Sequence, residues 1–105
     1  MATTQTLDLL IRQAARWSTA AVQDDHPFIA VLHANYGVAY ALALRQIAPD
    51  QEVIAKTGID PFDLERKVVK IQEGATLALS RSCPELSKRL GPLAVLAKEA
   101  ADLGD

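Results

Sequence analysis

The stretch from residue 28 to residue 44, FIAVLHANYGVAYALAL, limits the possible folds more than any other part of the chain, because it contains no Asp, Glu, Lys or Arg. A helix that is apolar nearly all round has to be sheltered from water on several sides. A membrane span needs about 20 apolar residues, and this shorter run is interrupted by His33, Asn35 and Gly37. We therefore predict the central helix of a soluble bundle, and no membrane partner.

Apolar residues recur at helical spacing in the rest of the chain as well, and turn-forming residues divide the segments. No segment alternates like a strand. The pattern predicts a last helix that opens at Pro92, preceded by helices over about residues 6–23, 27–48, 51–57 and 61–83. The expected fold class is all-α: an irregular antiparallel helical bundle of three long helices plus short helices, forming a single domain over residues 1–105.

Polar residues stand where these helices are expected to begin. Asp50 and Asp60 precede the short helix and the third long helix, and Asp25 or His26 precedes the central one. Side chains of this kind accept hydrogen bonds from the free N–H groups of a first helical turn. We therefore interpret the acidic pairs near these positions as helix caps and not as catalytic carboxylates. Gly58 suits a left-handed end to the short helix.

Small residues form a stripe on the central helix, where Ala30, Ala34, Gly37 and Ala41 recur at helical spacing. Such a stripe allows another backbone to approach closely, either within the chain or between subunits. Gly74 lies inside the third long helix, where Gly costs about 1 kcal/mol relative to Ala, so we expect it to mark a close crossing against the Gly37 region. A second copy of the chain would complete the cover of the central helix, which predicts a homodimer.

The charge balance gives little reason to expect a polyanionic partner. Lys and Arg number 11 against 13 Asp and Glu, for a formal net charge of -2, so no broad positive field attracts nucleic acid. The single cysteine, Cys83, excludes an internal disulfide framework, and no secretory signal is recognisable. These features predict a cytoplasmic protein. We interpret Cys83 as a half-buried structural thiol.

The most suggestive polar group is His33, Tyr36 and Tyr40, which share one face of the central helix at spacings of three and four. An imidazole and two phenols could line a pocket for a small polar or planar ligand. The competing interpretation is that these side chains satisfy one another or a subunit interface. His26 and His33 lie about 10.5 Å apart along a helix, which is awkward for joint ligation of an ion. We predict no metal, no cofactor and no catalytic residues.

Basic residues occur in two groups, and their neighbours are partly acidic and contain no aromatic side chain. This is typical of solvated helix faces and not of a nucleic-acid surface. The two groups are Arg66, Lys67 and Lys70, and Arg81, Lys88 and Arg89. The sequence thus favours a non-enzymatic module for self-association or binding of another protein. The alternatives are a small-ligand-binding bundle using His33, Tyr36 and Tyr40, and a DNA-associated regulator using the basic faces.

Overall fold

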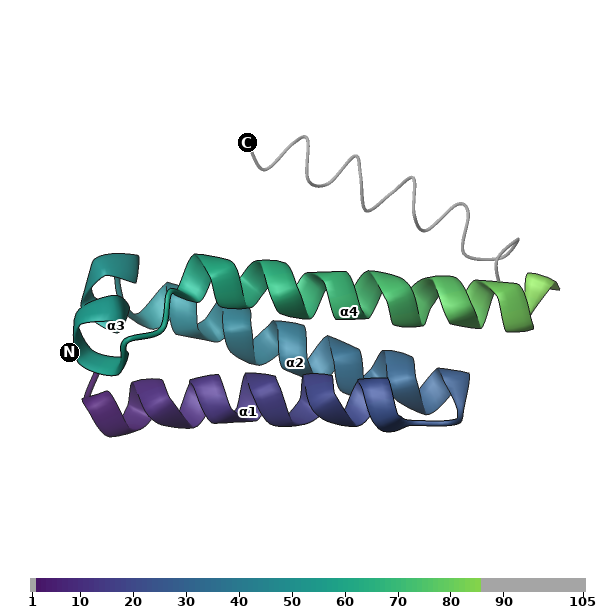
Figure 1. The fold of residues 1–105 in the computed structure, drawn as a ribbon, viewed down its shortest axis with the longest axis horizontal. Helices are drawn as coiled ribbons and strands as arrows, with labels where there is room; N and C mark the ends of the chain where they lie inside the picture. Colours follow the sequence, from purple (N-terminus) through teal and green to yellow (C-terminus); the bar gives the residue numbers. More distant parts are fainter. Residues whose placement is uncertain (1, 86–105) are drawn as a thin grey trace.

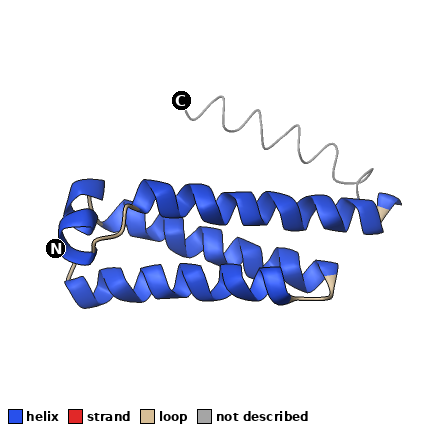
Figure 2. Ribbon diagram, viewed as in Figure 1, coloured by secondary structure: helices blue, strands red, loops and turns tan. Residues whose placement is uncertain are grey.

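The computed structural model describes residues 2–85, and this part of the chain is all-α, with no strand (Figure 2). It contains three long helices and one short helix: α1 (Thr4–Gln23), α2 (Pro27–Ile47), α3 (Asp50–Thr57) and α4 (Pro61–Ser82). The three long helices pack antiparallel, with α2 behind and between α1 and α4 (Figure 1). The predicted fold class is confirmed. The helix expected after Pro92 lies outside the described residues.

Local capping explains where the long helices begin. The Thr3 hydroxyl oxygen accepts a hydrogen bond from the Thr6 N–H at 3.1 Å. The Asp60 carboxylate accepts one from the Phe62 N–H at 2.9 Å. Of the two caps considered for α2, the structure selects His26, whose Nδ1 accepts from the Phe28 N–H at 3.3 Å. Each interaction satisfies a donor that the first helical turn leaves free.

The short helix differs in one detail from the prediction. Asp50 is its first residue and not its cap, which is Pro49 and makes no side-chain capping bond. The reason is that both carboxylate oxygens of Asp50 accept hydrogen bonds from Arg45, at 3.2 and 3.0 Å. Gly58 ends the helix with φ of 76°, in the left-handed region that glycine adopts without steric cost.

Two groups of fully or nearly buried apolar side chains hold the helices together. Around the end where α3 lies, the buried residues come from α1, α2, α3 and the turn after α2: Leu7, Leu44, Ala48 and Val53. Further along the bundle they come from α1, α2 and α4: Ala14, Val38, Ala41 and Val68. Since α2 contributes to both groups, it is the helix on which the other elements pack.

Gly37 is the point of closest approach between α1 and α2. A Cβ atom at this position would collide with the Ser18 hydroxyl and would lie 3.2 Å from the Ala14 carbonyl oxygen. The predicted close approach at the small-residue stripe is therefore confirmed, and its partner is α1 of the same chain. The crossing expected between Gly74 and the Gly37 region is wrong, because a Cβ on Gly74 would meet no atom of another described helix within 4 Å.

The expectation that α2 is sheltered on several sides is only partly met. Its buried residues face α1 and α4, and they are Ala30, Ala34, Gly37, Val38, Ala41 and Leu44. The remaining side is open, because three long helices cover only two sides of the one between them. Among the described helices, α2 is also the one long and apolar enough to cross a membrane, by length and composition alone.

Candidate functional site

His33 links α2 to the residue that ends α1, Asp24. Its Nδ1 lies 2.7 Å from an Asp24 carboxylate oxygen, and both side chains are about four-fifths buried, with 22% and 21% exposed. Asp24 is the residue that closes α1, and its backbone N–H donates to the Ala20 carbonyl oxygen. The short connection between the helices is thus fastened to the second turn of α2 by a hydrogen bond between the imidazole and a carboxylate, which is a strong acceptor.

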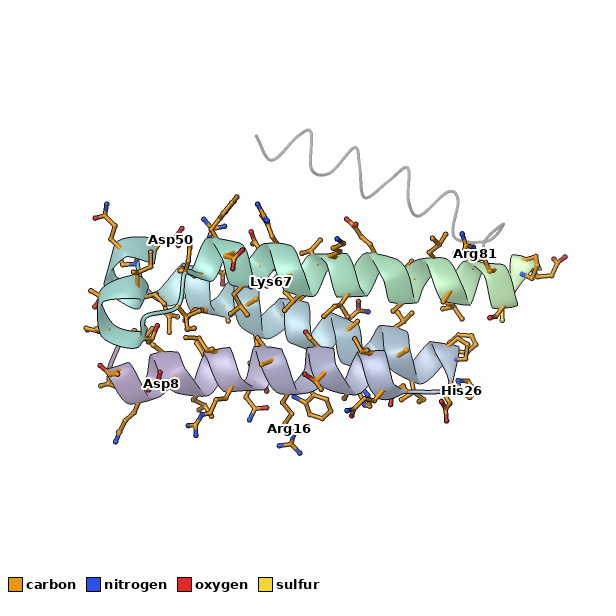
Figure 3. The ribbon with its side chains drawn as sticks, viewed as in Figure 1. Asp8, Arg16, His26, Asp50, Lys67 and Arg81 are labelled. Atoms are coloured by element: carbon orange, nitrogen blue, oxygen red, sulfur yellow. The ribbon has the colours of Figure 1, made fainter. Side chains whose placement is uncertain are left out.

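Aromatic rings surround this hydrogen bond. The Trp17 ring centroid lies 5.0 Å from that of His33 and 5.3 Å from that of Tyr36, in an edge-to-face arrangement with the tyrosine. The indole N–H donates to the Gln13 side chain at 3.1 Å. Arg16 projects outward from α1 and lies 5.3 Å from the Trp17 ring (Figure 3). These contacts form a half-buried aromatic corner in which the polar groups of Trp17 and His33 are partnered.

The structure brings together two of the three predicted site residues. The rings of His33 and Tyr36 lie 6.2 Å apart. Tyr40 is half-buried and packs against the apolar group that contains Ala14 and Val68. A hollow of about 400 Å³ lies near the same hairpin, but none of the three residues lines it. A ligand pocket at His33, Tyr36 and Tyr40 stays a prediction.

Sequence reasoning missed Asp24 and Trp17 as neighbours of His33. These neighbours could have been found from the short connection, because three residues between α1 and α2 force the helices to pack antiparallel. Residues at equal distances before and after the connection then lie side by side. Position 17 then faces positions 33 to 36, as position 14 faces Gly37. The interpretation of the acidic pairs as helix caps also missed this role of Asp24. Its carboxylate makes a hydrogen bond with His33, and its backbone N–H makes the last hydrogen bond of α1.

The open side of α2 carries only uncharged side chains, and we call it the α2 outer face. Phe28 is 51% exposed, Leu32 43% and Tyr36 42%. All its residues fall within an arc of about 100° on the helix. The face consists of Phe28, Ile29, Leu32, Tyr36, Ala39, Ala43 and Ile47. Tyr36 connects it to the aromatic corner.

The charged side chain of α2, Arg45, points toward α3 and α4 and lies outside this face. Arg45 donates to Asp50 and, at 2.8 Å, to Glu65, so it connects α2 to α3 and α4. Its guanidinium carbon lies 5.4 Å from the Phe62 ring. The hydrogen bonds to Asp50 raise the pKa of Arg45, and Glu65 adds to the effect. Arg45 is therefore a structural clamp between helices.

The other residues considered as sites have simpler surroundings. Lys67 pairs with Asp63, four residues earlier on α4, at 2.9 Å. Arg66 lies 4.0 Å from Asp63, so an acidic neighbour dilutes the charge of this basic group. The Phe62 ring, 6.0 Å from Arg66, is an aromatic neighbour that the sequence pattern did not predict. Cys83 is half-buried at the end of α4. Within residues 2–85, no group of three or more His, Cys, Asp or Glu could hold a metal ion.

The architecture defines the class of this protein: a small all-α bundle of three long antiparallel helices and a short one. Comparison with known proteins adds no family to this class, since the chain matches no protein-family model, no curated protein and no solved structure. The function therefore has to be argued from the described surface itself.

Proposed function

We propose that this protein is a non-enzymatic self-association module, which forms a homodimer through the α2 outer face. The observation that carries the proposal is the exposure of this face, where Phe28, Ile29, Leu32 and Tyr36 are each between 42% and 51% exposed. Contiguous apolar surface of this kind is uncommon on stable monomers and marks interaction sites. Its large aromatic and aliphatic side chains are those that bury well at an interface core.

A second copy is the favoured occupant because the face is suited to contact with itself. It carries no charged side chain, so two copies placed in contact meet no like-charge repulsion. It extends along α2 from Phe28 to Ile47, about 29 Å at 1.5 Å per residue. Ala39 lies near its middle and permits close approach of two α2 helices across a two-fold axis. The dimer would then supply the cover that α2 lacks within residues 2–85.

The experiment is sedimentation velocity and native mass spectrometry of the full chain and of Leu32→Glu. We expect the wild-type chain to be a dimer and Leu32→Glu to be a folded monomer, because the interface would bury an unpaired carboxylate. The dissociation constant should rise at least about a hundredfold. Leu9→Glu is the matched control, since Leu9 is similarly exposed at 47% but lies on α1; it should remain dimeric.

The other functions have distinct outcomes in the same measurements. A wild-type chain with the mass of one bare monomer would overturn the proposal. A retained small molecule that is lost on His33→Ala would favour the ligand-binding bundle instead. Binding to phosphatidylcholine vesicles that Leu32→Glu abolishes would assign the α2 outer face to lipid. Binding to duplex DNA that weakens steeply with salt would favour the basic helix faces.

A further inference from the structure

A second uncovered surface runs between α1 and α4, on the side of the bundle that Figure 1 presents in front of α2. Two hollows follow one another along this helix pair. One, of about 400 Å³, lies at the hairpin end between Val22 and Ala78, and the other, of about 450 Å³, lies between Ile11 and Leu64. We call this surface the α1–α4 groove. It does not include the α2 outer face.

The α4 wall of the groove has the form of a helix-packing surface. Its residues recur at steps of three and four: Leu64, Lys67, Ile71, Gly74, Ala75 and Ala78. The last three are small, and a Cβ on Gly74 would meet no described atom within 4 Å. Small side chains with open space above them allow a helix backbone to approach closely. Nothing packed on Gly74 within residues 2–85 offsets the cost of a glycine inside a helix.

The end of the described chain points to the occupant. α4 ends at Ser82, at the end of the bundle where His26 lies (Figure 3) and where the groove is bounded by Asp24 and Asp25. Another 20 residues follow position 85. Residues 83–91 are enough for a reversal of direction, because connections between bundle helices commonly span about 2–8 residues. The segment that begins at Pro92 can therefore return along the groove.

The length and the apolar pattern of this segment match the groove, and the basic residues that precede the segment are opposite in charge to the groove's acidic end. As a helix, residues 92–104 would be about 20 Å long, and the α4 wall from Leu64 to Ala78 is about 21 Å long. Leu93, Leu96, Ala100 and Leu103 fall on one helical face. Lys88 and Arg89 precede the segment in the sequence, and Asp24 and Asp25 line the hollow at the hairpin end of the groove. The charges at the entrance of the groove are therefore complementary.

We propose that residues 92–104 occupy the α1–α4 groove of their own chain as a helix antiparallel to α4, which completes a four-helix bundle. Leu93, Leu96 and Ala100 then cover Ala78, Ala75 and Ile71. This inference does not depend on dimerisation through α2, because the groove and the α2 outer face lie on different sides of the bundle. In this proposal the chain covers the α1–α4 groove by itself, and the α2 outer face is left for a partner.

Methyl-to-methyl NOE measurements on the full-length protein test the proposal. We expect contacts between the methyl groups of Leu93 or Leu96 and those of Ala75 or Ala78. In a sample that mixes labelled and unlabelled chains, an isotope filter should show that both methyl groups belong to the same chain. Contacts found only between chains, contacts only with Leu32 on α2, or no contacts from these leucines would each overturn the proposal.

Amide hydrogen exchange supplies a second, independent readout. Leu96→Glu places a carboxylate on the packing face and should accelerate exchange in residues 93–103 at least about tenfold relative to wild type. Val95→Glu is the matched control, because Val95 points about 120° away from the centre of this face; it should leave the exchange rates nearly unchanged. Equal exchange in the two variants would contradict the proposal. The dimer constant should stay unchanged in both variants, so failure here is distinct from failure of self-association.

Discussion

Gly37 and Ser18 decide how closely α1 and α2 approach one another. Ser18 is 3% exposed, and within residues 2–85 its hydroxyl oxygen has no hydrogen-bond partner. A buried hydroxyl without a partner costs about 1–3 kcal/mol. Its position directly over the missing side chain of Gly37 shows that space, and not hydrogen bonding, governs this contact. The two residues should therefore be energetically coupled.

Gly37→Ala is expected to lower the free energy of unfolding by about 1–3 kcal/mol, because the new methyl group collides with Ser18 and the helices have to separate. Urea denaturation followed by Trp17 fluorescence measures the change. Ser18→Ala alone should be neutral or stabilising, since it removes an unpartnered hydroxyl. The double variant should recover part of the loss. Strict additivity of the two substitutions would show that the contact does not limit the approach of the helices.

At the scale of elements, three interactions hold α3 at one end of the bundle and set the direction of α4. Val53 is fully buried against α1 and α2. Arg45 of α2 holds Asp50 at the beginning of α3 and Glu65 on α4. Gly58 then reverses the chain with a positive φ, so that α4 begins three residues later. The direction of α4, and with it the α1–α4 groove, depends on this reversal.

Gly58→Ala is expected to cost about 1–2 kcal/mol of stability, because a left-handed conformation brings the added Cβ close to the backbone. Apart from Gly58 itself and its two chain neighbours, no described atom lies within 4 Å of the position that this Cβ would occupy, so the cost is purely conformational. Gly58→Asn should cost less, since Asn tolerates this region better. Thermal and urea unfolding of the two variants measure the difference. Identical stabilities for wild type and both variants would contradict the left-handed end of α3.

At the scale of the whole molecule, three long helices leave two uncovered surfaces on opposite flanks of the bundle. The α2 outer face is uncharged and self-complementary, which suits a second copy. The α1–α4 groove begins next to the last described residues and has an acidic rim, which suits the basic and apolar residues that follow. If both proposals hold, one apolar surface is covered within the chain and the other by assembly.

Assembly through α2 predicts that thermal stability depends on protein concentration. Association that favours the folded state raises the apparent stability by mass action, so the Tm of the wild-type chain should increase between micromolar and hundred-micromolar samples. Leu32→Glu should show a Tm that does not change over the same range. Differential scanning calorimetry at several concentrations checks both. A concentration-independent Tm for wild type in this range would argue against a reversible dimer.

The sequence by itself determined the helices, because apolar periodicity, caps and glycines act over a few residues. It predicted the all-α class, the ends of α2 and α4 to within one or two residues, and the close approach at Gly37. The Asp63–Lys67 pair is local in the same way, because the two residues lie four apart within one helix.

Only the tertiary structure decided which helix meets which. Contacts such as Asp24 with His33, Trp17 with Tyr36, and Arg45 with Glu65 join positions set by the packing of separate helices. For the same reason Gly74 could not be placed from its own helix, and the uncharged run of α2 did not reveal which side stays open. The hydrophobic pattern indicates that an apolar helix surface has to be covered. The number and direction of the neighbouring helices determine which part of that surface stays exposed.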